Sequence, residues 1–89
     1  MKAAKTDANQ KAIVAVLRKA GASVQILSIV GRGFPDLLVG YRGINYLMEV
    51  KSLKGKLNNL QLDWMGKWRG QKCIVHTVDH ALERIGVKP

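Results

Sequence analysis

The sequence has one cysteine, no long apolar run and few acidic residues. The single Cys73 excludes an internal disulfide and a cysteine-based zinc site, and its place in an apolar run indicates a small buried side chain. No stretch approaches the roughly 20 apolar residues of a membrane span. The polar start, Met1-Lys2-Ala3-Ala4-Lys5, lacks the pattern of a signal peptide. We therefore expect a cytoplasmic protein with no membrane partner.

The shortage of acidic residues makes the chain strongly basic. Fifteen Lys and Arg against six Asp and Glu give a formal net charge of +9. Such a charge favours a polyanionic partner, and nucleic acid fits better than a membrane surface. With 89 residues, 47% of them hydrophobic, the chain suffices for one modest core. We expect a single domain over residues 1–89, with a short basic tail over residues 1–5.

Two apolar runs separated by turn residues predict a β-hairpin between Gly31 and Lys51. If Arg42 and Gly43 form a two-residue loop, Gly43 supplies the positive φ that such turns require. Asp36 then lies six residues before the loop and Glu49 six residues after it. In an antiparallel pair these positions face each other with Cβ atoms about 5 Å apart. Alternation places an apolar set on one face, which we expect to be core: Leu37, Val39, Tyr41, Ile44, Tyr46, Met48 and Val50.

The opposite face of this hairpin is charged only at the end away from the turn, by Asp36, Glu49 and Lys51. Two facing carboxylates repel unless a cation lies between them, and their oxygen atoms suit Mg²⁺ or Mn²⁺. The Lys51 ammonium can reach the same corner, as a charge for a phosphate or an attacking water. The pattern is a phosphodiester-hydrolysis site in outline. The same spacing also fits an ordinary exposed cross-strand charge cluster after a turn at Pro35.

The wider order of motifs resembles the PD-(D/E)XK nucleases and, more narrowly, the small stand-alone phage and bacterial members of the virus-type replication-repair nuclease (VRR-NUC) family. The resemblance runs from about residue 7 to residue 78. The motifs that carry it are Gly33-Phe34-Pro35-Asp36, Met48-Glu49-Val50-Lys51, Gly55-Lys56-Leu57 and Gln61-Leu62-Asp63-Trp64. It implies an α/β, restriction-endonuclease-like core of order α-β-β-β-α-β-α, with a mixed sheet flanked by helices.

The resemblance also implies an activity and a ligand set. A VRR-NUC domain of this kind would be a metal-dependent DNA endonuclease, selective for branched or four-way-junction DNA. Asp36, Glu49 and the Val50 carbonyl would bind Mg²⁺ or Mn²⁺, and Lys51 would be catalytic. Gln61 matches a recurrent glutamine of the family, and we expect it to orient Lys51, a water or a phosphate oxygen.

Residues 7–20 predict the first helix, which Gly21 ends. Many VRR-NUC relatives carry a glutamate on this helix that approaches the metal, and the matching position here is Gln10. An amide oxygen can still bind a metal or its water, but it brings no charge. Gln10 could equally close a capping box with Thr6 or Asp7 at the N-cap. Both interpretations stay open at this stage.

The remaining elements follow from periodicity and turn residues. We expect a strand over residues 22–28, with Val24, Ile26 and Ser28 on one face, and a helix from the cap Asn58 to Arg69. On that helix Leu60, Trp64 and Trp68 form a stripe that favours core over a base-stacking platform. A last strand over residues 73–78 precedes a short helix capped by Asp79. His76 should be structural and His80 exposed.

Basic loops flank the predicted site. Arg32 lies in a glycine-rich turn just before Asp36, and Lys54 and Lys56 follow Lys51. We expect these three side chains to contact DNA phosphates without reading sequence. Because one metal centre cuts one strand, resolving a junction favours a homodimer. Two alternatives are a non-catalytic DNA-binding module, which Gln10 supports, and a structural subunit of a phage or replication complex.

Overall fold

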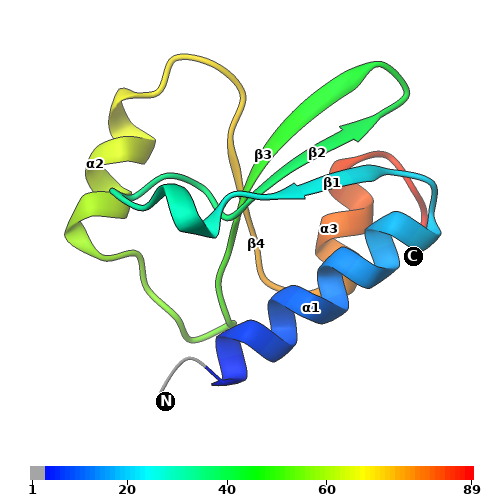
Figure 1. Ribbon diagram of the computed structural model, residues 1–89, viewed down its shortest axis with the longest axis horizontal. Coiled ribbons are helices and arrows are strands. Elements are labelled where there is room, and N and C mark those ends of the chain that lie inside the picture. Colours follow the sequence, from blue (N-terminus) through cyan, green and yellow to red (C-terminus); the bar gives the residue numbers. More distant parts are fainter. Residues whose placement is uncertain (1–3) are drawn as a thin grey trace.

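The computed structural model describes the backbone of residues 4–89 and the side chains from residue 8 onward. The elements, shown in Figure 1, are α1 (Ala4–Lys19), β1 (Ser23–Ile26), a 3-10 turn η1 (Ser28–Val30), β2 (Leu37–Tyr41), β3 (Ile44–Val50), α2 (Asn59–Lys67), β4 (Cys73–Val75) and α3 (Val78–Arg84). This confirms the α/β class and the order α-β-β-β-α-β-α. None of the helices within residues 4–89 is long and apolar enough to cross a membrane.

The four strands form one mixed sheet of order β1-β2-β3-β4. β1 and β3 are antiparallel to β2, and β4 is parallel to β3. The hairpin has the predicted register, with Tyr41 paired to Ile44 and Leu37 to Met48. Arg42 and Gly43 both have positive φ, 51° and 80°. This is the backbone of a type I′ turn, whose twist matches that of the strands, so the turn fixes the register.

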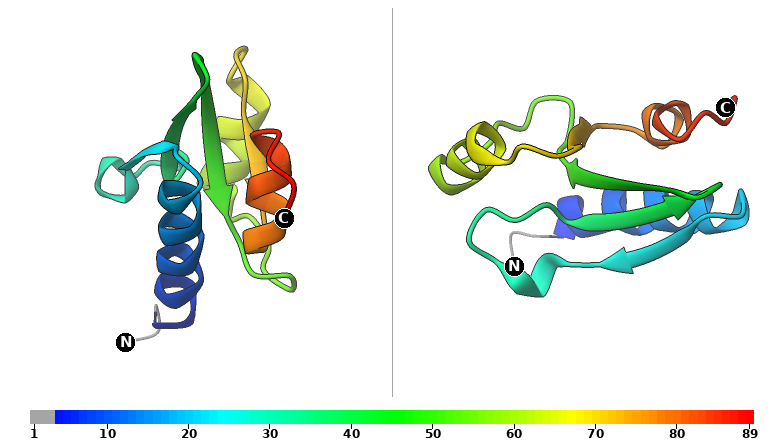
Figure 2. Two further views of the ribbon diagram at one scale, coloured as in Figure 1. Left: turned by 90° about the vertical axis from the view of Figure 1, so that its right-hand side faces the viewer. Right: turned by 90° about the horizontal axis from the view of Figure 1, so that it is seen from above.

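The core lies between one face of the sheet and two helices. α1 and α3 lie side by side on this face (Figures 1 and 2). The prediction that Ile44 belongs to the core is wrong. Its side chain is 53% exposed, because it lies beside the turn, at the end of the sheet. The buried apolar residues come from both helices, from β2, β3 and β4, and from positions just after the helices: Ile13, Val14, Leu17, Ala22, Leu37, Val39, Met48, Val50, Cys73, Val75, Ala81, Leu82 and Ile85.

Two predictions at the N-terminal end are wrong in detail. α1 begins at Ala4, so Thr6 and Asp7 lie inside the helix and neither is its N-cap. The alanine-rich start extends the helix because alanine has the highest helix propensity. The predicted tail over residues 1–5 lies mostly outside the described residues, and Lys5 belongs to α1. β1 ends at Ile26, and Ser28 lies in η1.

The last strand is shorter than predicted, and the last helix begins one residue before its predicted cap. β4 ends at Val75, three residues before the expected end. The Thr77 side chain caps α3, where its Oγ1 accepts a hydrogen bond from His80 N at 3.0 Å. The predicted cap, Asp79, lies instead in the first turn of α3, where its charge is favourable to the helix dipole.

α2 has the predicted N-cap but not the predicted packing. Asn58 Oδ1 accepts from Gln61 N at 2.9 Å, and Gln61 Oε1 accepts from Asn58 N at 3.0 Å, which forms a capping box. The helix ends at Lys67, with Trp68 as its C-cap. Figures 1 and 2 show α2 at the opposite end of the molecule from α3. Leu60 is 61% and Trp68 40% exposed, so the prediction of a core stripe is wrong.

Candidate active site

The hairpin brings Asp36 and Glu49 together at its open end. Asp36 lies just before β2, and its Oδ2 accepts a hydrogen bond from Val50 N at 2.9 Å. The Asp36 carbonyl accepts from Leu27 N at 2.7 Å, which ties the residue to the segment after β1. The Asp36 carboxylate is therefore held by the backbone next to Glu49, as the register requires.

Glu49 is almost fully buried. It is 1% exposed, and its Oε2 accepts a hydrogen bond from Gln61 Nε2 at 3.0 Å. Its Oε1 is buried without a hydrogen-bond partner among the described residues. Burial, and then the charge of Asp36, raise the pKa of Glu49 to about 8, against a smaller opposing effect of Lys51. The alternative of an ordinary exposed charge cluster is therefore wrong for Glu49.

The donor set fits a hard divalent cation. A buried carboxylate oxygen without a hydrogen-bond partner, beside a second carboxylate, would be stabilised by a bound cation. Among the described side chains no group of three or more His, Cys, Asp or Glu could hold a metal. A cation here would therefore need further oxygen ligands, such as the Val50 carbonyl, water or a phosphate. Mg²⁺ and Mn²⁺ accept such mixed oxygen sets, and Mg²⁺ usually keeps several waters.

Gln61 joins the α2 N-terminus to Glu49. Its amide oxygen completes the capping box, while its amide nitrogen donates to Glu49. Gly33 packs directly against the backbone of Leu60 in the first turn of α2, and a Cβ at Gly33 would collide with the Leu60 carbonyl. The loop before Asp36 thus rests on α2. The predicted contact of Gln61 with Lys51, water or phosphate stays a prediction.

His76 lies next to Lys51, which sequence reasoning did not reveal. Its Nδ1 lies 3.0 Å from the Lys51 carbonyl oxygen and 3.3 Å from that of Ser52, and Lys51 N donates to Val75 O at 3.0 Å. His80 is half-buried rather than exposed, because its ring stacks on His76 at 5.8 Å. The parallel pairing of β3 with β4 was the signal that could have placed His76 there.

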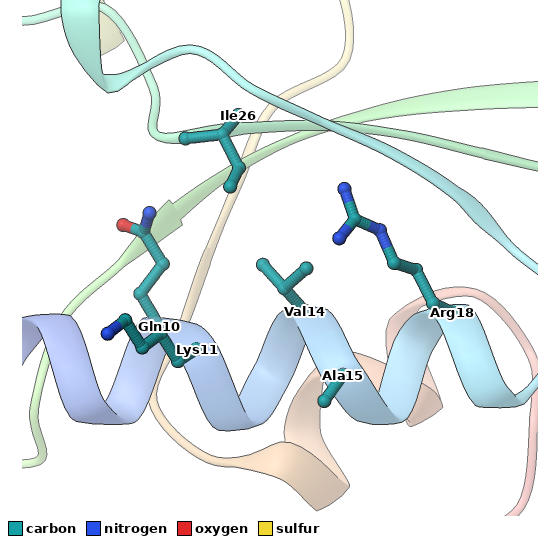
Figure 3. Close-up of a pocket in the computed structure, with 6 residues that line it drawn as sticks. All are labelled: Gln10, Lys11, Val14, Ala15, Arg18 and Ile26. Atoms are coloured by element: carbon teal, nitrogen blue, oxygen red, sulfur yellow. The ribbon is translucent and has the colours of Figure 1, made fainter.

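Gln10 lines a hollow of about 200 Å³ between α1 and β1, which neither Asp36 nor Glu49 lines (Figure 3). Its amide nitrogen donates to Ser28 Oγ at 3.4 Å. The hollow is otherwise lined by the side chains of Lys11, Val14, Ala15, Arg18 and Ile26. The described hydrogen bond does not join Gln10 to either carboxylate, and its approach to a metal stays a prediction.

The three predicted phosphate contacts are all exposed. Arg32 has a φ of 56° and stands between Gly31 and Gly33, whose φ values are also positive. Lys54 and Lys56 lie in the loop between β3 and α2. These three basic side chains are therefore accessible to a partner, one on the segment before Asp36 and two on the segment after Glu49.

A hairpin that brings two carboxylates and a lysine to one corner of a mixed sheet flanked by helices is the arrangement of a PD-(D/E)XK-type nuclease domain. A solved structure described as a VRR_NUC domain superposes on this chain with a TM-score of 0.71 and 29% sequence identity, over 89% of this chain and 91% of that one. The chain therefore has the VRR-NUC fold, that of a nuclease-type domain. No protein-family model matches the sequence, and neither does any curated protein.

Proposed function

We propose that this protein is a DNA endonuclease that depends on Mg²⁺ or Mn²⁺. The observation that carries the proposal is the Asp36–Glu49 pair, with its buried, unpartnered Glu49 Oε1. A purely structural acid at this position would be expected to have both oxygens paired, because an unsatisfied buried polar atom costs about 1–3 kcal/mol. The structural similarity to a VRR_NUC domain also supports a nuclease function.

The chain's own residues have separable roles in this mechanism. Asp36 and Glu49, with the Val50 carbonyl, would hold the cation. Gln61 orients the Glu49 carboxylate, and the backbone N–H of Val50 orients that of Asp36. Lys51 places a positive charge beside the carboxylates, where it can bind a phosphate oxygen or orient water. When bound, a divalent cation would lower the pKa of a water and neutralise charge on the phosphate.

DNA is the proposed partner because the chain is strongly basic. The net charge is +9, and Arg32, Lys54 and Lys56 are exposed around the carboxylates. Contacts of this kind neutralise phosphates and release counterions, so affinity should fall steeply with salt and depend little on sequence. Branched or four-way-junction DNA is the substrate class that we propose.

We further propose that the protein acts as a homodimer, which would present two cation sites to the two strands of a junction. Large apolar side chains are exposed on neighbouring segments: Ile29 in η1 is 96%, Leu60 61% and Leu62 55% exposed. The packing of Gly33 on the Leu60 backbone brings these segments together. Sedimentation at micromolar concentration should show a species of twice 9.8 kDa. A monomer that makes single unpaired nicks would contradict this proposal.

The deciding experiment is incubation with plasmid, linear and four-way-junction DNA in Mg²⁺, in Mn²⁺ and in EDTA. Asp36→Asn, Glu49→Gln and Lys51→Ala should each abolish cleavage and leave DNA binding largely intact. Asp63→Asn is the matched control, because Asp63 is an exposed carboxylate paired with Lys67 on α2. Retention of more than about a tenth of the activity by either carboxylate variant would exclude that residue as a ligand. Binding without cleavage in either metal would identify a non-catalytic DNA-binding module instead.

A further inference from the structure

The sheet face that carries Glu49 is open beyond α2. A hollow of about 210 Å³ lies over β2 and β3, lined by Leu38, Asn45, Leu47, Trp68, Gly70 and Gln71. A second hollow of about 200 Å³ shares Leu38 and Asn45 and continues over Ser23, Val24, Gln25 and Gly40 toward β1. Together the two hollows form a trough across the sheet, on the face opposite to α1 and α3.

Trp68 forms one wall of the trough and is held in place from several sides. Its ring stacks on Trp64 with centroids 4.9 Å apart and planes at 15°, and Trp64 in turn makes a T-shaped contact with Phe34. Gly70 packs against the indole Nε1, where a Cβ would come within 2.9 Å, and Lys72 Nζ donates to the Trp68 carbonyl at 2.7 Å. A tryptophan that is fixed in this way and still 40% exposed is available to bind a partner.

The other lining groups are suited to nucleobases. Asn45 and Gln71 carry amides, which both donate and accept hydrogen bonds and so tolerate any base edge. Gln71 Oε1 accepts a hydrogen bond from Leu47 N at 2.6 Å, which fixes the Gln71 side chain at the edge of the trough. Among the described side chains that line the trough, none is acidic. A negatively charged strand therefore meets no repulsion there.

The trough begins at Leu47, two residues before Glu49 on β3. Leu47 and Glu49 are two residues apart on β3 and point to the same face, a distance of about 7 Å along the strand. An unstacked nucleotide spans roughly twice the 3.4 Å rise per base of a B-form strand. A strand with a phosphate at Asp36 and Glu49 can thus place the next base over Leu47, against Trp68.

We propose that this trough binds an unpaired nucleotide of the DNA strand to be cut, with its base stacked on Trp68. The inference rests on the proposed nuclease function and specifies its substrate. A base paired inside a duplex cannot lie flat on a protein ring, so only a displaced or single-stranded base gains this contact. Trp68 therefore makes the protein prefer gapped or branched DNA over perfect duplex.

Binding in EDTA tests the inference without cleavage. Fluorescence anisotropy compares a duplex, the same duplex with a single-stranded gap, and that gap built from abasic sites. The wild type should prefer the gapped duplex, and abasic sites should remove the preference. Trp68→Ala should weaken binding to the gapped duplex by about tenfold and leave duplex binding unchanged, while Trp68→Phe retains most of the preference. Ile44→Ala is the matched control, because Ile44 is an exposed apolar residue beside the hairpin turn that lines neither hollow of the trough.

Several outcomes would overturn the inference. Equal affinity of the wild type for intact and gapped duplex, or equal affinity for the gap with and without bases, would exclude base stacking. This arm uses no variant and stands even if Trp68→Ala fails to fold. A Trp68→Ala protein that becomes monomeric without losing the preference would mean that a second copy covers the trough. Because cleavage is not measured, an inactive protein can still confirm the subsite, and an active one can refute it.

Discussion

Replacing Glu49 with glutamine should stabilise the metal-free protein at alkaline pH while it removes the proposed activity. Burial and the neighbouring Asp36 raise the pKa of Glu49 from 4.5 to about 8. The folded protein thus keeps this proton to higher pH than the unfolded chain does. The sign follows: the stability present in acid is lost as pH rises through about 8. Glutamine is neutral at every pH, and its amide oxygen can still accept the hydrogen bond from Gln61 Nε2.

The magnitude follows from the same shift. At roughly 1.4 kcal/mol per pKa unit, the whole shift corresponds to at most about 5 kcal/mol of unfolding free energy. The part that falls between about pH 6.5 and pH 8.5 is about 2 kcal/mol. Wild-type protein in EDTA should lose about this much across the interval relative to Glu49→Gln. Comparing the two proteins removes the contributions of all the titratable groups that both contain.

The assay is denaturant unfolding of both proteins at several pH values in EDTA. Glu83→Gln is the matched control, because Glu83 is exposed on α3 and its variant should follow the wild type. Adding Mg²⁺ at about pH 8.5 should restore stability to the wild type and not to Glu49→Gln, since a ligand stabilises only the state that binds it. An identical pH dependence of wild type and Glu49→Gln would refute the reasoning about the buried acid.

Three further variants test the surroundings of the site. Gln61→Ala should lower the unfolding free energy by about 1 kcal/mol and reduce cleavage, because one amide serves both the α2 cap and Glu49; unchanged unfolding curves would contradict this. Gln10→Ala should raise the metal concentration needed for cleavage with little change in melting temperature; a normal metal titration would place Gln10 outside the site. The double variant Lys54→Ala/Lys56→Ala should weaken DNA binding equally for unrelated sequences and reduce the slope of log affinity against log salt concentration by about one for each lysine. An unchanged slope would mean that neither side chain contacts DNA.

The hairpin was predictable because two local rules determine it. A two-residue turn at Arg42-Gly43 sets the register, and alternation then decides which side chains share a face. Together these rules place Asp36 opposite Glu49 without knowledge of the rest of the fold. The burial of Glu49 did not follow from them, because it depends on Gln61, which is brought in by α2 from the next part of the chain.

The failures of prediction concern tertiary packing. The Trp64 and Trp68 stripe has helical spacing, which usually marks a core face, but both core-covering helices lie on the other side of the sheet. Sequence periodicity reports that a face is apolar and cannot report what covers it. The Thr77 cap was missed for a related reason, since Thr77 and Asp79 both have capping side chains and only the early end of β4 decides between them.

α2 links the two halves of the proposed mechanism. Every residue of this helix is at least partly exposed, so the helix is held by the Gln61–Glu49 hydrogen bond, the Phe34–Trp64 contact and the Gly33 approach rather than by core burial. An element with so little buried surface opens at lower free energy than the sheet and α1 do. The same helix carries Gln61 at its first turn and leads directly into Trp68. A DNA strand that stacks a base on Trp68 would therefore also hold α2 against Glu49. Binding of the substrate would then fix the Glu49 carboxylate in the position in which it is proposed to hold the cation.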